Sequence, residues 1–325
     1  MPLHSLFTRA ALSGVLLLTV SAAFAQAPLV ASRPIPVPGG PGGFDWMLVD
    51  QAKHRLYAAH GGTKTLAVLD LKTEAVRQIA AGDVSGAAVD APDSKVFVAC
   101  GDNKVVVLDN DTLRKTAEIA VPGPVDDIKL DPKSGMVYAD HDDGAEVWVI
   151  NAKTNTLVGS VAVAGAPEAM VYDAGADRLY QNIKPADTVD VIDPATNKII
   201  AIWRTAPASS PHGLVLDTAP HRLFAAGGNG MLVALDQKTG RVTASVAIAP
   251  GTDQIGFDPK KQRIYCASRG YVAVVQETAE GMRLLGNVPA PRGAHTLAVD
   301  PATGNIWVSY SNPSGSYLEK FTPSE

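Results

Sequence analysis

The chain has 325 residues and a formal net charge of −5, with 46% hydrophobic and 19% charged residues. This mildly acidic balance provides no basic surface of the kind that binds nucleic acid, so we expect no nucleic-acid partner. The length allows one large all-β or α/β-barrel domain, or two ordinary domains.

The first 25 residues are typical of a secretory signal peptide. Arg9 precedes the apolar run ALSGVLLLTVSAAFA, which ends in the small-x-small sequence Ala23-Phe24-Ala25. The run is too short to cross a membrane comfortably, and no other apolar run in the sequence approaches membrane-spanning length. We therefore expect cleavage near Ala25, a mature chain over residues 26–325 with no membrane span, and a periplasmic or secreted location.

The rest of the chain repeats with a spacing of 40 to 44 residues. Each repeat contains a reference aspartate, and an aromatic residue follows it seven positions later. The aspartates are Asp50, Asp90, Asp131, Asp173, Asp217, Asp258 and Asp300, and the aromatic residues are Tyr57, Phe97, Tyr138, Tyr180, Phe224, Tyr265 and Trp307. We interpret both positions as structural: the aspartate accepts N–H groups of a turn, and the aromatic side chain packs between repeats.

Each repeat also contains β-rich runs such as LAVLD, VVVLD and VWVIN, separated by short polar turns. Four short strands in about 42 residues are typical of a β-propeller blade. Seven repeats therefore predict an all-β fold, a single seven-bladed β-propeller over residues 26–325. The seventh repeat ends without a fourth strand, and VASRPIPVPGG near the N-terminus resembles the fourth strand of repeat 2, so we expect the N-terminal segment to complete the last blade.

The repeat sequences identify a family resemblance. The second-strand motifs YAAH, FVAC and YADH, and third strands such as VWVINAKTNTLVGSVAVAG, resemble the YVTN-type repeats of the YncE-like family of exported bacterial seven-bladed propellers. The resemblance covers essentially the whole mature chain and implies the fold and an exported location. It implies no activity, because most such proteins have none assigned and a fold does not determine a function. Related propellers include lactone hydrolases and streptogramin-type lyases, but none of their catalytic motifs matches here.

Polar residues that the repeat does not explain predict a ligand site. One set lies five residues before each reference aspartate, where the innermost strand begins, and another lies ten residues after it, where the second strand ends. Four of the six histidines outside the leader fall in these sets, beside carboxylates. The predicted ligand-binding residues at this upper mouth of the channel are Asp45, His60, Asp126, His141, Glu168, His212, Asp253 and His295.

Histidines beside carboxylates can bind a divalent metal, act as general acid and base, or hydrogen-bond a polar ligand. No sequence motif chooses among these, so neither a metal nor a cofactor is assigned. ALDQKTGRV resembles one turn of a pyrroloquinoline-quinone propeller, but it occurs once and that cofactor is not predicted. Arg292 could bind an anionic group or pair with a carboxylate at the mouth. The run from Asp140 to Asp143 favours an exposed acidic loop over a cation site.

The two cysteines, Cys100 and Cys266, fall in repeats 2 and 6. They are too far apart around a ring for a disulfide, which requires Cα atoms within about 7 Å, so both are predicted to be free thiols. Cys100 is expected near the mouth.

Three functional hypotheses follow. The first is an exported, monomeric propeller that binds a small polar ligand, a metal or a partner protein at the upper mouth. The second is a lactone hydrolase or lyase that uses the histidines and carboxylates of the mouth. The third is a protein-interaction scaffold without a small-molecule site.

Overall fold

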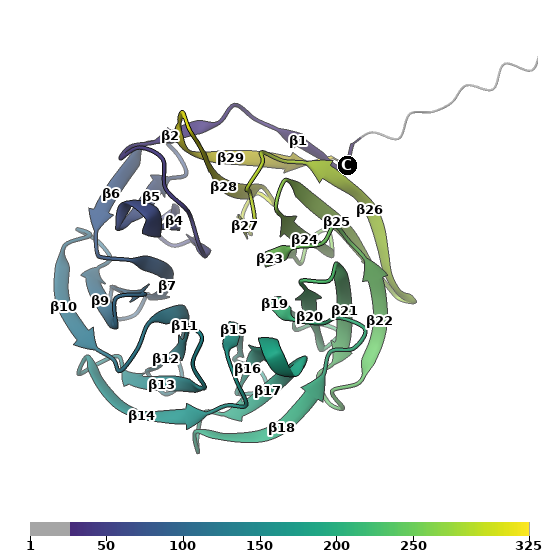
Figure 1. Cartoon of the computed structure of the whole chain (residues 1–325), viewed down its shortest axis with the longest axis horizontal. Coiled ribbons are helices and arrows are strands. Elements are labelled where there is room, and N and C mark those ends of the chain that lie inside the picture. Colours follow the sequence, from purple (N-terminus) through teal and green to yellow (C-terminus); the bar gives the residue numbers. More distant parts are fainter. Residues whose placement is uncertain (1–26, 325) are drawn as a thin grey trace, which may run out of the picture.

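A computed structural model describes residues 27–324 of the chain. The predicted signal peptide and its cleavage site lie outside the described residues. Within residues 27–324 the strands form seven antiparallel sheets arranged in a ring around a central channel (Figure 1). The fold is therefore a seven-bladed β-propeller, as the repeat predicts. None of the described helices is long and apolar enough to cross a membrane.

Each blade begins with its innermost strand and proceeds outward in chain order. Blades 1 and 2 consist of β3 (Met47–Asp50), β4 (Arg55–His60), β5 (Thr65–Asp70), β6 (Val76–Ala80), then β7 (Val84–Asp90), β8 (Lys95–Cys100), β9 (Lys104–Asp109), β10 (Lys115–Ala120). Blades 3 and 4 consist of β11 (Val125–Asp131), β12 (Met136–His141), β13 (Glu146–Asn151), β14 (Thr156–Ala162), then β15 (Pro167–Asp173), β16 (Arg178–Ile183), β17 (Thr188–Asp193), β18 (Lys198–Arg204). Blades 5 and 6 consist of β19 (Pro211–Asp217), β20 (Arg222–Gly227), β21 (Met231–Asp236), β22 (Val242–Ala247), then β23 (Thr252–Asp258), β24 (Arg263–Ser268), β25 (Tyr271–Thr278), β26 (Gly281–Pro289). Two short 3₁₀ turns, η1 (Gly61–Thr63) and η2 (Lys184–Ala186), follow the second strands of blades 1 and 4.

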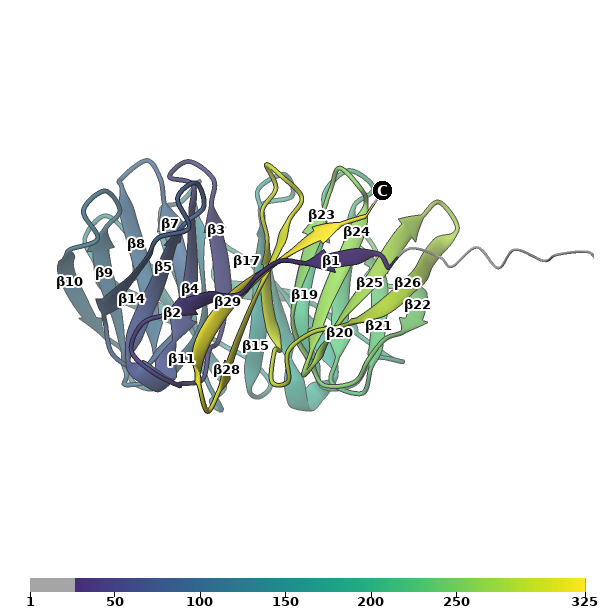
Figure 2. The same cartoon turned by 90° about the horizontal axis from the view of Figure 1, so that it is seen from above.

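Blade 7 joins the two ends of the described chain. Its own strands are β27 (Thr296–Val299), β28 (Ile306–Asn312) and β29 (Gly315–Pro323), and the N-terminal strands β1 (Leu29–Ala31) and β2 (Ile35–Val37) both pair with β29. Figure 2 shows β1 and β29 side by side at the edge of the ring. The N-terminal segment therefore supplies the outer edge of the last blade, as predicted. It does so as two short strands, separated at Arg33 and Pro34, rather than as one.

The repeated aspartates and aromatic residues have the structural roles expected of them. Asp131 accepts backbone N–H bonds from Lys133 at 2.8 Å and Ser134 at 3.3 Å, and the other reference aspartates accept similar bonds in their turns. All seven aromatic side chains are at most 3% exposed. Tyr57 of blade 1 donates a hydrogen bond to Asn110 of blade 2 at 2.5 Å, so the aromatic position also links neighbouring blades.

Both cysteines are buried free thiols, as predicted. Burial raises the pKa of Cys100 to about 12, and its Sγ atom lies near the carbonyl oxygens of Ala81 and Val98. Although Cys100 ends a second strand near the mouth, its side chain is fully buried and lines no described cavity there. It therefore packs in the interior as a small apolar residue.

At the interface of blades 5 and 6, two carboxyl groups replace an amide–carboxylate hydrogen bond that links other neighbouring blades. After the third strand of blades 2 and 5, Asn110 and Gln237 donate hydrogen bonds to the reference aspartates of the preceding blades, Asp50 at 2.9 Å and Asp173 at 3.1 Å. Blade 6 has Glu277 at the corresponding position, against Asp217 of blade 5. Glu277 also accepts a hydrogen bond from Arg222 at 2.8 Å. Burial and the neighbouring Asp217 raise the pKa of Glu277 to about 6, above its ordinary value of 4.5.

This carboxyl pair predicts a pH-dependent stability. Between pH 4.5 and about 6 the native state binds more protons than the unfolded state, so stability should fall as the pH rises through this window, by about 2 kcal/mol. Glu277→Gln supplies the amide donor used in the other blades, and should flatten this dependence and raise the free energy of unfolding at pH 7. Urea unfolding between pH 4 and 8 measures both effects.

The converse substitution, Gln237→Glu, should introduce a similar pH dependence at the interface of blades 4 and 5. Equal pH profiles for the native protein and Glu277→Gln would contradict the shared role of Asp217 and Glu277.

Candidate functional site

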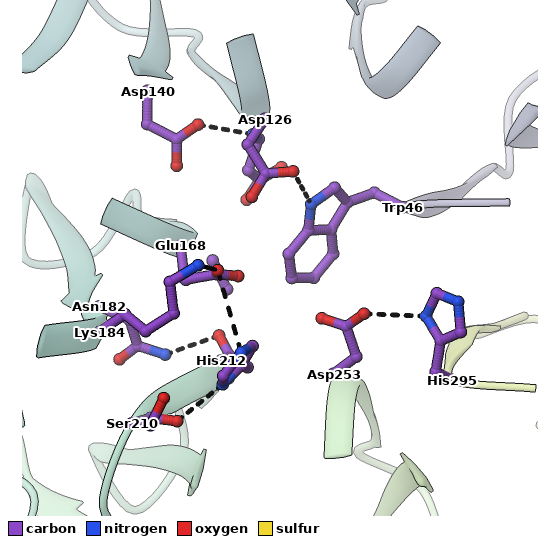
Figure 3. Close-up of polar contacts among 12 residues, drawn as sticks. Trp46, Asp126, Asp140, Glu168, Asn182, Lys184, Ser210, His212, Asp253 and His295 are labelled. Carbon is purple, nitrogen blue, oxygen red and sulfur yellow. Dashed lines mark hydrogen bonds and ion pairs between the residues drawn. The ribbon is translucent and has the colours of Figure 1, made fainter. Parts of the chain in front are cut away.

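A cavity of about 430 Å³ opens at the upper mouth, the face of the ring where the innermost strands begin. Five blades contribute to its wall. The lining residues are Asp45, Trp46, Asp126, Asp142, Glu168, His212, Gly228, Gly251, Thr252, Asp253 and Arg269. Five of the eight predicted ligand-binding residues therefore lie around one cavity, namely Asp45, Asp126, Glu168, His212 and Asp253. Figure 3 shows the last four of these around the mouth.

A repeated β-bulge places most of these side chains. The pairing between the first and second strands of blades 2 to 6 shifts register at the residue five before the reference aspartate. In blade 3, for example, Val125 pairs with His141 and Ile128 pairs with Ala139, so Asp126 lies within the irregular part. A bulge redirects side chains that would otherwise alternate between the two faces of a sheet. The same backbone feature therefore presents Asp126, Glu168, His212 and Asp253 at the mouth.

Trp46 separates the mouth cavity from the channel below it. Its indole Nε1–H donates a hydrogen bond to Asp126 Oδ1 at 3.0 Å, and Figure 3 shows the ring projecting between Asp126, Glu168 and Asp253. Trp46 lines both the mouth cavity and a second cavity of about 630 Å³, whose wall is formed mainly by apolar side chains of the innermost strands. The mouth cavity is thus polar at its sides and aromatic at its floor.

Glu168 is the most buried carboxylate of the mouth, with 6% of its surface exposed. Lys184 forms an ion pair with it, and His212 Nε2 lies 4.0 Å from Glu168 Oε1. The Nδ1 atom of His212 lies 2.7 Å from the carbonyl oxygen of Ser210, so Nδ1–H is the donor and Nε2 faces the carboxylate. Burial raises the pKa of Glu168, while the charges of His212 and Lys184 oppose that rise.

Asp253 and His295 form a second polar pair. His295 Nδ1 lies 2.8 Å from Asp253 Oδ2, and both side chains are about 30% exposed. Asp253 lines the cavity, whereas His295 lies behind it in the first part of blade 7. A carboxylate in this position orients an imidazole through its Nδ1 atom.

The carboxylates of the mouth repel one another. Burial raises the pKa of Asp45 well above its ordinary range, and the negative charges of Asp253 and Glu168 raise it further. Burial likewise raises the pKa of Asp126, followed by the charge of Asp45. Burial and mutual repulsion therefore both favour the protonated forms of Asp45 and Asp126 over their ionised forms.

A side cavity of about 260 Å³ adjoins the mouth over blades 1 to 3. It shares Asp45, Asp126 and Asp142 with the main cavity and adds Asp83 and Ser85. Ser85 is the blade 2 equivalent of Asp126, but its hydroxyl donates to the carbonyl oxygen of Val125 at 2.6 Å and is 8% exposed. The acidic character of the mouth therefore extends sideways beyond the main cavity.

His60 lies outside both cavities. It is fully buried and stacks on Phe44 with ring centroids 4.1 Å apart. Its Nε2 lies 2.9 Å from Ser316 Oγ of blade 7, and Gln78 Nε2 lies 3.1 Å from its Nδ1. Burial lowers the pKa of His60, which favours the neutral ring. These contacts favour a structural role in closing the ring over the predicted ligand-binding role.

His141 also lies outside the cavities. Its ring stacks on Trp148 with centroids 4.7 Å apart, and its buried Nδ1 has no hydrogen-bond partner among residues 27–324. Gly123 and Gly144 approach it so closely that a Cβ atom on either would collide with the ring. The sequence favours an exposed acidic loop from Asp140 to Asp143. The structure differs from this expectation, because only Asp143 in that run is exposed. Asp142 lines the cavity.

Asp140 is fully buried behind the mouth. Its carboxylate accepts the Asp127 N–H at 2.6 Å and a hydrogen bond from Gln181 Nε2 at 3.3 Å. Gln181 also donates to the carbonyl oxygen of Glu168 at 2.5 Å. Asp140 and Gln181 therefore hold the two bulges that carry Asp126 and Glu168.

Several residues of the site were not predicted. Trp46 and Gln254 each directly follow a mouth residue. Four other blades have a small residue at this position of the repeat, so comparing the position across the blades could have found both. Lys184 and Arg269 each lie eleven residues after a reference aspartate, one position beyond the second mouth set, so extending that set by one residue could have found them. Arg292 is exposed and lines neither cavity, whereas Arg269 lines the mouth.

The arrangement does not resemble a metal centre. Among residues 27–324, no group of three or more His, Cys, Asp or Glu side chains is placed to hold a metal ion. The carboxylates are distributed around the wall of a cavity that is much larger than an ion. The geometry is suited to a polyatomic polar ligand.

Comparison with known proteins agrees with the fold and the repeats. The chain is 26% identical to the uncharacterized protein YncE of Salmonella typhimurium over 253 residues, which is 75% of this chain and 69% of YncE. The chain is therefore similar to YncE over most of its length, and both comparisons agree with a β-propeller fold. It is also 27% identical to the protein NirF of Stutzerimonas stutzeri over 131 residues, and this match spans about a third of NirF and 39% of the chain. No family model matches the sequence.

Solved structures resemble this propeller in fold alone. Kuenenia stuttgartiensis hydrazine synthase gives a TM-score of 0.74 at 14% identity, covering 92% of this chain and 98% of that chain. The structure of U3-55K gives 0.76 at 10% identity, covering 90% of this chain and 98% of that chain. These identities are too low to transfer a function, and function in propellers depends on residues grafted on a shared fold.

Gln254 is predicted to stabilise the propeller where its innermost strands, β3 and β27, are shortest. The Gln254 amide donates to the Met47 carbonyl at 2.8 Å and accepts N–H bonds from Met47 at 3.0 Å and Leu297 at 3.2 Å. It thus connects blade 6 with blades 1 and 7. Gln254→Leu should lower the free energy of unfolding by about 2–4 kcal/mol, because it leaves buried backbone groups unpaired. Urea denaturation measures this loss, with Gln51→Leu in an exposed turn as the control; equal losses would contradict the role.

Proposed function

We propose that this protein is an exported β-propeller that binds a small polar ligand at the upper mouth of its channel. The observation that carries the proposal is the convergence of five predicted residues, from five different blades, on one cavity of about 430 Å³. Clefts of this size with a few convergent polar groups are common small-molecule sites. The N-terminal leader sequence supports export.

The electrostatics of the cavity also support binding. Buried, mutually repelling carboxylates destabilise a fold, and such groups are concentrated at functional sites. The fold could have placed apolar or neutral residues at these positions, as it does at Ser85 in blade 2. Asp45, Asp126 and Asp253 are therefore best explained by a ligand that uses their charge.

This proposal predicts a ligand response that depends on the mouth. A thermal-shift screen of the mature chain against small polar metabolites should find compounds that raise the melting temperature. Asp45→Asn and Asp253→Asn should each weaken that response about tenfold or more in ligand concentration, because a charge-assisted hydrogen bond is lost. Asp111→Asn, an exposed carboxylate beside Lys53 on the opposite face, is the matched control. Unchanged responses in both mouth variants would contradict the proposal.

A second candidate function is hydrolysis or elimination on a bound substrate, as in a lactone hydrolase or lyase. His212 favours it, because this ring lines the cavity, the Ser210 carbonyl orients it through Nδ1 at 2.7 Å, and Nε2 faces Glu168 and is available for proton transfer.

If the protein is such an enzyme, a panel of lactones should show turnover. His212→Gln can preserve a hydrogen bond to the Ser210 carbonyl but cannot exchange protons, so it should reduce kcat by about 100-fold or more. Ligand binding measured by thermal shift should persist in this variant. Turnover that His212→Gln leaves unchanged would exclude His212 as the acid or base.

A further inference from the structure

Carboxylates outnumber cationic side chains around the mouth and side cavities, where Arg269 is the one Lys or Arg among the lining residues. Six carboxylates line the two cavities, belonging to Asp45, Asp83, Asp126, Asp142, Glu168 and Asp253. Glu168 pairs with Lys184 and lies near His212, and Asp253 pairs with His295. The other four form no ion pair with any Lys, Arg or His among residues 27–324. A ligand with positive charge would supply what the wall lacks.

Trp46 is an independent indication of a cation of a particular kind. The indole forms the floor of the mouth cavity, and its hydrogen bond to Asp126 fixes its orientation. The electron-rich face of an indole attracts organic ammonium groups, and tryptophan is the strongest side chain in this respect. An indole offers nothing to a hydrated metal ion in place of its oxygen ligands. Aromatic floor and carboxylate walls together match an alkylammonium group, whose N–H donors and apolar chain need different partners.

The shape of the site indicates more than one positive charge. Asp45, Asp126 and Asp142 lie where the mouth cavity and the side cavity meet. Glu168 and Asp253 belong to the mouth cavity alone, and Asp83 belongs to the side cavity alone. Carboxylates are thus present at both ends and in the middle of a continuous acidic path. A compact ligand would use one end of this path and leave the other unpaired.

We propose that the ligand is a linear organic dication, a diamine or polyamine, with one ammonium group in the mouth cavity over Trp46 and another in the side cavity near Asp83. This inference rests on the proposed function, because it names the ligand class for the same mouth. The carboxylates bind the two ammonium groups, and the indole packs against the alkyl chain and the first ammonium. Asp83 selects for the second charge.

The test is isothermal titration of the mature chain at 150 mM salt with 1,4-diaminobutane, butylamine and Mg²⁺ as separate ligands, where we choose the salt to screen weak surface binding. The diamine should bind about tenfold or more tightly than butylamine, since it forms one further charge-assisted contact. Mg²⁺, which carries the same charge, should bind more weakly than the diamine. Equal affinity for diamine and butylamine, or tighter binding of Mg²⁺, would overturn the inference.

Substitutions at the two ends of the site test the two ammonium positions separately. Asp83→Asn should reduce the affinity for the diamine to that for butylamine and leave butylamine unchanged. Asp45→Asn should weaken both amines, and Trp46→Leu should weaken both while leaving Mg²⁺ unchanged. Asp111→Asn serves as the control, and thermal unfolding of each variant without ligand verifies that it is folded. If Asp83→Asn and Asp45→Asn bind the diamine like the native protein, the amine binds elsewhere and the inference fails.

The failure of this inference differs from failure of the proposed function. If neither amine binds but another small compound does so in a manner that Asp45→Asn abolishes, the mouth is a ligand site for a different class. If no compound of the screen depends on Asp45 or Asp253, both proposals fail together.

Discussion

The ring of blades depends on the pairing of the N-terminal strands with β29. Each blade buries apolar faces against its two neighbours, so a break at any interface exposes two such faces and two sheet edges. Blade 7 would leave β29 as an open edge if β1 and β2 did not cover it. Contacts from blade 1 strengthen this joint, because His60 lies 2.9 Å from Ser316 and the Gly42 N–H donates to the same hydroxyl at 3.2 Å. His60, which the sequence predicts at the mouth, therefore helps to close the ring.

Closure makes the mouth a rigid frame on which charge can be concentrated. The bulges at the starts of the innermost strands aim one side chain per blade toward the axis, and the closed ring prevents those side chains from moving apart when their charges repel. Buried hydrogen bonds behind the mouth resist the same repulsion: Asp140 holds the backbone at Asp127, and Gln181 holds the carbonyl of Glu168. These polar residues stand where most other blades have alanine or valine, so the support is confined to blades 3 and 4.

The sequence predicts the fold in more detail than the site, for a physical reason. Seven aspartates and seven aromatic residues perform the same task seven times, and a period makes such residues visible in one chain. The residues of a ligand site act once each. Positions in the repeat identify Asp45, Asp126, Glu168, His212 and Asp253, because a bulge places the starts of innermost strands at the axis. The ends of second strands differ, because His60 and His141 line neither mouth cavity and instead stack on Phe44 and Trp148. Those strands lie one step farther from the axis, and their last residues pack between blades.

The division of the channel by Trp46 links these features to binding. Displacing water from an apolar wall lowers the free energy of binding, so a ligand site needs one such wall. The start of every innermost strand, however, contributes a polar residue. Trp46 provides the apolar wall, because its indole covers the apolar channel below and is held by the Asp126 carboxylate beside it. The same hydrogen bond partly satisfies Asp126, whereas burial and the charges of Asp253 and Glu168 raise the pKa of Asp45. A cation bound as we propose would therefore couple binding to the position of the floor through Asp126, because it would draw on the carboxylate that also holds the indole across the channel.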